Sequence, residues 1–309
     1  MIGLGSTIWI VSLFYGPIKD LYSDLEYKRC QKNWWTSLLF INNHYNQHDM
    51  CYFITWYLAA DTQLYVISLI ILSMIWKFKH KTKLILSISV LIGILIPTAI
   101  SYVYNLDVIY RLTPESFDFN AIYSSTYANM ATYMVGICFG YIYFQKKNYN
   151  IFNNLLHKLI WWVAFIGLPI LVVLTSSYYY SRLYSAIMSG ILKPLYALGI
   201  GIGVLGMSQK IGGLMQKVCE WKPAIFMGNF TYSTYVVHYG IVFYRTATAK
   251  QPLYVSDFVI ITSFMYDAVL SFLCGFLMHI FVEMPSLQLQ KMLVPQVRRQ
   301  RTANDSKNK

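Results

Sequence analysis

Long runs of apolar residues separated by short polar connections dominate this chain. A first, shorter run covers residues 2–15, and seven more lie at roughly 62–76, 84–104, 127–144, 159–179, 184–207, 223–245 and 258–282. Most of them approach the ~20 residues that a helix needs to cross a bilayer. The runs are continuous rather than alternating, which favours helices over the strands of a barrel. We therefore predict an all-α, polytopic integral membrane helix bundle with about eight transmembrane helices.

Polar segments lie beside this bundle at two places. Residues 16–61 separate the first run from the second, and we expect them to form an outer loop. Residues 296–309 are polar, basic and free of periodicity, which predicts a disordered cytoplasmic tail. The sequence thus predicts one transmembrane domain over residues 1–295, followed by the tail.

The composition favours a membrane protein and argues against a nucleic-acid partner. Hydrophobic residues make up 56% of the chain and charged residues only 12%, about half of what a soluble domain carries. The net charge of +12 would suit nucleic acid, but the basic residues lie mostly in the short connections and in the tail. Because this is a pattern of membrane topology, the partners that we expect are membrane lipids.

The distribution of Lys and Arg predicts the orientation. Sixteen of them lie in the connections after the second, fourth and sixth runs and in the tail, and eight lie on the opposite side. Since cytoplasmic loops are enriched in basic residues, we expect both termini in the cytoplasm. Residues 16–61 and 105–126 then lie outside or in a lumen. The protein would be a multi-pass protein of the plasma membrane or of an endomembrane.

The five cysteines differ in their surroundings. Cys138 and Cys274 lie inside apolar runs, and Cys219 lies in a cytoplasmic connection. Cys30 and Cys51 are the two cysteines of the outer stretch, where disulfides are permitted. Two pairings remain open: a bond between Cys30 and Cys51, or a bond between Cys30 and a cysteine upstream of this sequence.

A metal site is not expected from the histidines of the outer stretch. His44, His48, Asp49 and Cys51 lie close together in the sequence. Loop histidines beside Asn and Gln are usually solvated, however, and no Cys or His spacing typical of zinc is present. We therefore predict neither a metal nor a bound cofactor.

Ionisable residues within the apolar runs need an explanation, because a charge at the centre of a membrane helix costs about 2.5 kcal/mol or more. Asp267 and Lys193 are the clearest cases, as a structural ion pair or as snorkelling side chains. Thr231, His238 and Arg245 are seven residues apart and share one helical stripe. That stripe either makes hydrogen bonds between helices or lines a substrate path.

An aromatic segment with an acidic residue opens the second run. Trp56 lies near its start, and Asp61 and Tyr65 are four residues apart, so they share a helix face. Physically, this describes an aromatic belt with a carboxylate near a helix N-terminus, where the helix dipole stabilises negative charge.

The same segment resembles the W-x-L-x-x-[ED]-x-Q-F-Y signature of membrane acyltransferases of the acyltransferase-3 type. The resemblance is strongest to their animal branch, the nose-resistant-to-fluoxetine proteins, and it covers roughly residues 10–290. Four further stretches resemble family motifs in the expected order: Cys30 with Asn33-Trp34-Trp35 and Leu39-Phe40-Ile41-Asn42-Asn43; Tyr133-Met134-Val135-Gly136 with Gly140-Tyr141; Thr231-Tyr232-x-x-Tyr235-Val236-Val237-His238; and Glu283-x-Pro285.

The chain also departs from the family pattern. The family arginine before the fourth span falls on Asn129, the proline of the same motif on Thr132, and another proline on Leu69. The pattern opens with a helix carrying a basic residue and a histidine thought to be essential, and we find no counterpart of it. The resemblance therefore implies an N-terminally incomplete or a degenerate member of the family, and we expect the chain to be inactive alone.

The resemblance implies transfer of an acyl group from acyl-CoA, as co-substrate, to a hydroxyl acceptor. Such a reaction needs a base for the hydroxyl proton and donors for the developing oxyanion. Carried over onto this chain, the catalytic candidates are Asp61, Gln63 and His238. The candidates for substrate binding are Trp56, Tyr65, Tyr133, Tyr232 and Arg245.

A lipid or small-molecule transporter, or a non-catalytic membrane scaffold, is the alternative. Runs interrupted by Pro97, Pro169 and Pro194, together with buried ions, would also fit a transporter. No pair of matching halves is visible, so inverted repeats have no support. The oligomeric state is not predicted.

Overall fold

The protein is mostly helical and has no strand over the residues that its computed structural model describes, which are 19–106, 117–146, 154–175, 181–249 and 256–293. This confirms the all-α prediction for those residues. Within these described residues, five helical stretches are long and apolar enough to cross a membrane: Thr55–Lys77, Lys79–Tyr104, Leu155–Thr175, Arg182–Ser208 and Asp257–Leu293. The chain is therefore a multi-pass membrane helix bundle.

Of the remaining apolar runs, one forms a single helix, one is divided between two helices, and one is not described. Run 127–144 forms α6 (Thr126–Lys146). Run 223–245 is divided between α11 (Lys222–Gly228) and α12 (Thr231–Ala247), and the 17 residues of α12 are few for a full span. Run 2–15 and the tail 296–309 lie outside the described residues. The count of eight transmembrane helices thus stays a prediction.

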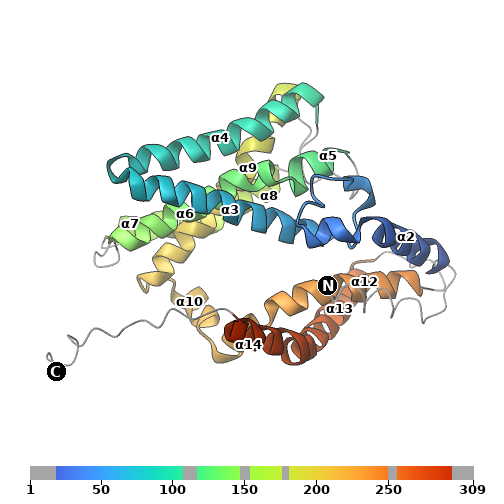
Figure 1. Ribbon diagram of the computed structural model, residues 1–309. Helices are drawn as coiled ribbons and strands as arrows, with labels where there is room; N and C mark the ends of the chain where they lie inside the picture. Colours follow the sequence, from blue (N-terminus) through green and yellow to red (C-terminus); the bar gives the residue numbers. More distant parts are fainter. Residues whose placement is uncertain (1–18, 107–116, 147–153, 176–180, 250–255, 294–309) are drawn as a thin grey trace. The chain divides into compact units, whose positions relative to one another are not determined.

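The chain divides into two compact units, and residues 21–221 make up nearly all of the first. Its elements, coloured from blue to yellow in Figure 1, are α2 (Lys19–Leu38), α3 (Thr55–Lys77), α4 (Thr82–Tyr104), α5 (Phe117–Phe119), α6, α7 (Leu155–Trp162), α8 (Leu168–Thr175), α9 (Arg182–Ser208) and α10 (Gly213–Cys219). Short π-helical segments lie at Asn120–Ser124 and Val163–Gly167. The 20 residues of α2 lie within the stretch expected to be a loop. Because α2 is polar, hydropathy does not reveal it.

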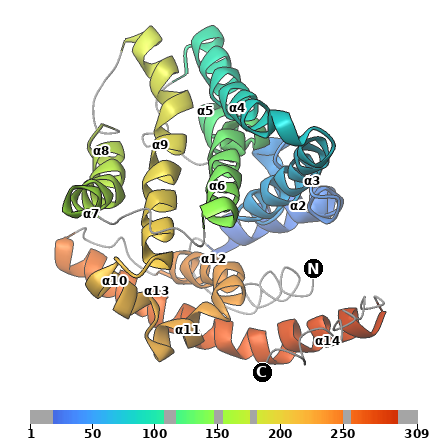
Figure 2. The ribbon, with the colours of Figure 1, turned by 90° about the vertical axis from the view of Figure 1, so that its left-hand side faces the viewer.

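Helices α4, α6 and α9 pack against one another in the first unit (Figure 2). Gly93 permits the close approach of α4 to α6, because a Cβ there would lie 2.6 Å from the backbone nitrogen of Ala131. Without a hydrophobic force between helices in lipid, such close backbone contact supplies much of the packing energy. The same packing places the start of α6 beside α3.

A partly buried lysine joins α9 to the start of α6. The Lys193 ammonium donates to the carbonyls of Ile122 and Tyr123, at 3.1 and 3.0 Å, and to Oδ1 of Asn129 at 2.9 Å. It also lies 4.8 Å from the centre of the Tyr123 ring. The two carbonyls belong to the π-helical segment, where the regular helix ladder is interrupted. Lys193 is therefore held by oxygen acceptors and a ring.

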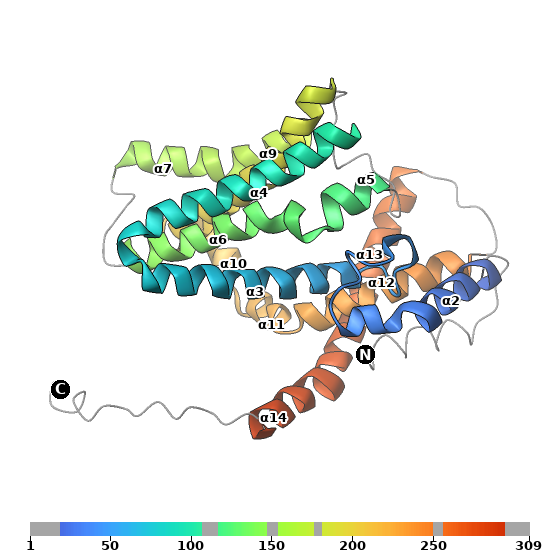
Figure 3. The same cartoon turned by 45° about the horizontal axis from the view of Figure 1, so that its top comes forward.

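The second unit contains α11, α12, α13 (Asp257–Met278), a π-helical segment at His279–Glu283 and α14 (Met284–Leu293). Helices α13 and α14 run on as one long helix through that segment (Figure 3). Helix α12 packs along α13. The two helices approach closely at Gly275, where a Cβ would lie 2.7 Å from the Cα of Thr234.

Candidate functional site

A disulfide connects α2 to the segment before α3. Cys30 and Cys51 are both buried and are bonded, with their Cα atoms 4.3 Å apart. Of the two pairings that the sequence left open, the structure has the one within this chain. Asn33 donates from Nδ2 to the carbonyl of Asp49 at 2.9 Å, beside the disulfide. The disulfide thereby closes the chain between Cys30 and Cys51 into a loop that precedes the start of α3.

Gln63, a predicted catalytic residue, lies at the centre of a hydrogen-bond network. Its Nε2 donates to the carbonyl of Phe40 at 2.6 Å and to Oδ1 of Asn43 at 3.0 Å. Its Oε1 accepts from the hydroxyl of Thr126, the first residue of α6. Gln63 thus ties α3 to the outer loop and to α6. Both of its amide hydrogens are used, so donation to a substrate carbonyl would require the release of one of them.

His44 extends this network. Its Nε2 lies 2.9 Å from Oγ1 of Thr126, which also accepts from Nδ2 of Asn43 at 2.9 Å. Partial burial of the ring lowers the pKa of His44 below its ordinary 6.5, and a hydrogen bond with Gln63 opposes that shift. The imidazole is therefore neutral at physiological pH. Sequence reasoning considered His44 only as a metal ligand and missed it as a cavity residue.

A cavity of about 590 Å³ opens beside the network. Its polar lining residues are His44, Thr62, Gln63 and Thr126, and its apolar ones are Leu39, Phe40, Ile41, Val66, Ile67, Tyr127 and Met130. A mostly apolar cavity of this size with a few converging polar groups is typical of small-molecule sites. Phe40 has a φ of 56°, a conformation that non-glycine residues rarely adopt, and Gln63 holds its carbonyl there.

The other residues predicted near Gln63 do not line this cavity. Trp56 packs edge-on against Tyr123, with ring centres 5.1 Å apart. Asp61 and Tyr65 are exposed on α3, as expected for a polar and aromatic belt. Tyr133 is half-buried on α6. Their assigned roles in catalysis and substrate binding stay predictions.

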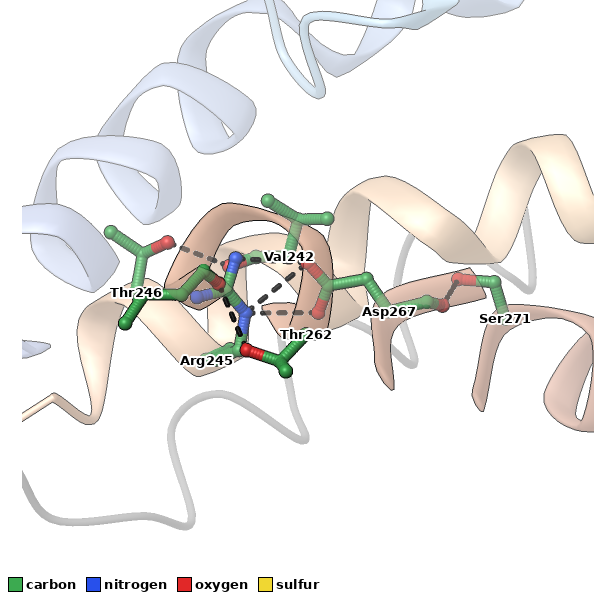
Figure 4. A network of polar contacts seen from close by, with 7 residues as sticks. Val242, Arg245, Thr246, Thr262, Asp267 and Ser271 are labelled. Carbon is green, nitrogen blue, oxygen red and sulfur yellow. Dashed lines mark hydrogen bonds and ion pairs between the residues drawn. The ribbon is translucent and has the colours of Figure 1, made fainter. Parts of the chain in front are cut away.

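In the second unit, Arg245 and Asp267 form a bidentate ion pair between α12 and α13 (Figure 4). Nε and Nη2 of Arg245 donate to the two carboxylate oxygens at 2.9 and 2.8 Å. The expected partner of Asp267 was Lys193, and the structure gives each of the two residues other partners. Arg245 on the polar stripe thus bonds to the neighbouring helix, and its role in substrate binding stays a prediction.

His238 and Tyr232, the other candidates on α12, have different surroundings. His238 lies with Nδ1 2.5 Å from the carbonyl of Tyr235 in its own helix. Tyr232 is exposed in the first turn of α12, and its role in substrate binding stays a prediction.

Glu283 is the last residue of the π-helical segment His279–Glu283, and its carboxylate bonds both to α12 and to the first residue of that segment. Its Oε2 accepts from the hydroxyl of Ser233 at 2.6 Å and lies 2.9 Å from Nδ1 of His279. Ser233 is fully buried. The Glu283-x-Pro285 match pointed to the carboxylate, but His279 and Ser233 were missed, because neither belongs to a pattern that identifies it.

No group of three or more His, Cys, Asp or Glu residues in the described part of the chain is placed to hold a metal ion. Cys51, one member of the cluster considered from the sequence, is bonded to Cys30 and cannot act as a thiolate ligand.

Comparisons with known proteins cover both units. The model of the acyltransferase-3 family, described as an acyltransferase domain, matches residues 4–285. Nose resistant to fluoxetine protein 6 of Caenorhabditis elegans is 23% identical over 308 residues, which cover 92% of this chain and 37% of that protein. This chain therefore spans little more than a third of the relative's length. No solved structure matches.

Proposed function

The chain belongs to the acyltransferase-3 family, and on this premise we propose that it is a membrane-bound acyltransferase that transfers an acyl group from acyl-CoA to a hydroxyl group of an acceptor. The family match over residues 4–285 is the observation that carries this proposal. The multi-pass helical structure agrees with it, because an acyl chain and a lipid-soluble acceptor are both available within a bilayer.

The network around Gln63 supports the same reaction. Two of the segments that resemble family motifs meet here: Asn43 comes from the outer loop and Gln63 from α3, and both bond to Thr126 at the start of α6. The resulting cavity combines apolar walls with oriented polar groups. Acyl transfer needs this combination, because the apolar part excludes water while the polar part positions the reacting groups.

The proposed orientation places this cavity on the outer side and both termini in the cytoplasm. The reason is the excess of Lys and Arg in the connections after the second, fourth and sixth runs. In sealed, right-side-out vesicles we expect a C-terminal tag to resist added protease and a tag within 105–126 to be cleaved. Cleavage of the C-terminal tag in intact vesicles would contradict the orientation.

For the proposed activity, we expect membranes containing the full gene product to transfer label from radiolabelled acyl-CoA to an added alcohol, whereas the family resemblance predicts that residues 1–309 alone are inactive. Gln63→Leu should lower the rate by about 10²-fold, because the loop and α6 lose the group that holds their positions. Gln145→Leu, at the other end of α6, is the matched control and should retain the rate. An absence of transfer by the wild-type protein to any hydroxyl acceptor would refute the proposed function.

A further inference from the structure

Another cavity, of about 660 Å³, lies in the first unit between α6 and α9, which run side by side in Figure 2. Its lining residues belong to 132–143 of α6 and 196–208 of α9, and none of them lines the cavity beside Gln63. The lining is mostly apolar. At 1.5 Å per residue the stretch of α6 is about 16 Å long, close to the ~15 Å of hydrocarbon in one leaflet. The cavity therefore has the length of an acyl chain within a single leaflet.

Two glycines of α6 open this cavity. Gly136 and Gly140 are exposed, and a Cβ added to either would have no other atom within 4 Å. Gly93 and Gly201 differ from them, because a Cβ there would collide with residues of α6. Helix packing within the first unit thus accounts for Gly93 and Gly201 but not for the empty space beside Gly136 and Gly140.

Basic residues gather at one end of the cavity. Lys146 follows the lining residue Tyr143 by three positions, so the two share a helix face. Lys210 comes two residues after Ser208, the last lining residue of α9, and both lysines are exposed. Residues 119–219 contain seven Lys and Arg but no Asp or Glu. This end of the cavity therefore favours an anion that the segment itself does not provide.

The charge near the opposite end is already used. Lys193 lies one turn before Tyr196, the first lining residue of α9. Its ammonium has three hydrogens, and it donates to three oxygen atoms of the segment before α6 and of Asn129. An anionic ligand is therefore attracted to the end beside Lys146 and Lys210, which the proposed orientation places at the cytoplasmic surface.

We propose that this cavity holds one acyl chain of an anionic glycerophospholipid of the cytoplasmic leaflet, whose headgroup phosphate lies beside Lys146 and Lys210. Anionic lipids are concentrated in that leaflet and attract nearby lysines. The acyl chain passes Gly136 and Gly140 towards the middle of the bilayer. An acyl-CoA also combines a chain with phosphates, but its thioester would then lie at the cytoplasmic surface, away from the cavity beside Gln63 near the outer end of α6. The lipid site does not depend on the proposed transfer activity.

A photoactivatable phosphatidylserine with a diazirine in its acyl chain tests the site. In nanodiscs of phosphatidylcholine, it should label 132–143 and 196–208 of the wild-type protein, as located by mass spectrometry of the digest. The matching phosphatidylcholine probe should label them less. Lys146→Gln and Lys210→Gln should each weaken phosphatidylserine binding about 5-fold and leave labelling by the phosphatidylcholine probe unchanged. Lys81→Gln, exposed in the connection between α3 and α4, is the matched control and should change neither.

Gly140→Leu fills the cavity without removing a charge. Because a Cβ at Gly140 meets no atom within 4 Å, the thermal unfolding temperature should stay close to wild type. Labelling by phosphatidylserine should be largely lost, since the leucine side chain occupies the path of the acyl chain. Gly228→Leu in α11, where a Cβ also meets no atom within 4 Å, is the matched control and should retain the labelling.

Four results would each overturn the proposal. Equal labelling by the two probes would show that the headgroup is not recognised. Undiminished labelling of a folded Gly140→Leu variant would place the lipid elsewhere. Displacement of phosphatidylserine by a lower concentration of palmitoyl-CoA would assign the cavity to the acyl donor. Cross-links between residues 132–143 of two copies of the chain, in place of lipid labelling, would make this face of α6 a dimer contact.

Discussion

Asp267→Asn is expected to lower the free energy of unfolding by about 3–5 kcal/mol, because it leaves the Arg245 guanidinium without its counter-charge. The Asp267 side chain is only 13% exposed and that of Arg245 29%, so water replaces little of the lost interaction. The bidentate geometry adds to the loss, since two charge-assisted hydrogen bonds are weakened together. Chemical or thermal unfolding of the purified protein in detergent measures the change.

A double change distinguishes an ion pair from two independent residues. Arg245→Met combined with Asp267→Leu removes both charges and should be closer to wild type than Asp267→Asn alone. Asp257→Asn is the matched control, because this exposed carboxylate in the first turn of α13 contributes only its dipole interaction, about 0.3–1 kcal/mol. Equal destabilisation by the single and the double change would contradict the pairing.

Loss of the Cys30–Cys51 disulfide should lower stability by about 3 kcal/mol. The two cysteines are 21 residues apart, and in the chain-entropy model a bond that closes a loop of this length stabilises by that amount. The loop includes Asn43 and His44, so Cys30→Ser with Cys51→Ser should also weaken acyl transfer through the Gln63 network. Thermal unfolding and a transfer assay measure the two effects.

The free thiol of Cys219 supplies the control for the disulfide variant. Cys219 is exposed on α10, and Cys219→Ser should change neither stability nor transfer. Mass spectrometry of a non-reduced digest should recover the peptides of Cys30 and Cys51 joined. Recovery of both residues as free thiols from the wild-type protein would refute the prediction.

Sequence analysis found the helices whose residues are apolar enough to lie in a bilayer. Apolar runs such as 62–76 and 184–207 became α3 and α9, because a chain in lipid must satisfy its backbone hydrogen bonds within each segment. Helix α2 was missed for the complementary reason: its residues are polar, so hydropathy does not reveal it. The break that separates α11 from α12 lies inside an apolar run, where hydropathy carries no signal.

The candidate site was found in part. The family signature led to Gln63, but it could not show that both amide hydrogens of Gln63 are already used. His44 stands among Asn, Tyr and Gln in a loop and carries no sequence pattern of its own. Its contact with Thr126 spans 82 positions in the chain, so only folding brings the two side chains together.

The sequence by itself determined that the chain is a helical membrane protein of this family, because hydropathy and motif order depend on residues that are near one another in the chain. Which residues pair with Asp267 and with Lys193 was decided by the tertiary structure alone. The sequence suggested Lys193 as the partner of Asp267, whereas the packing of α12 along α13 gives it Arg245. Lys193 is instead held by the carbonyls of a π-helical segment. Electrostatic pairing depends on distances of a few ångströms between helices, and these distances depend on contacts such as that of Gly275 with Thr234 that no periodicity encodes.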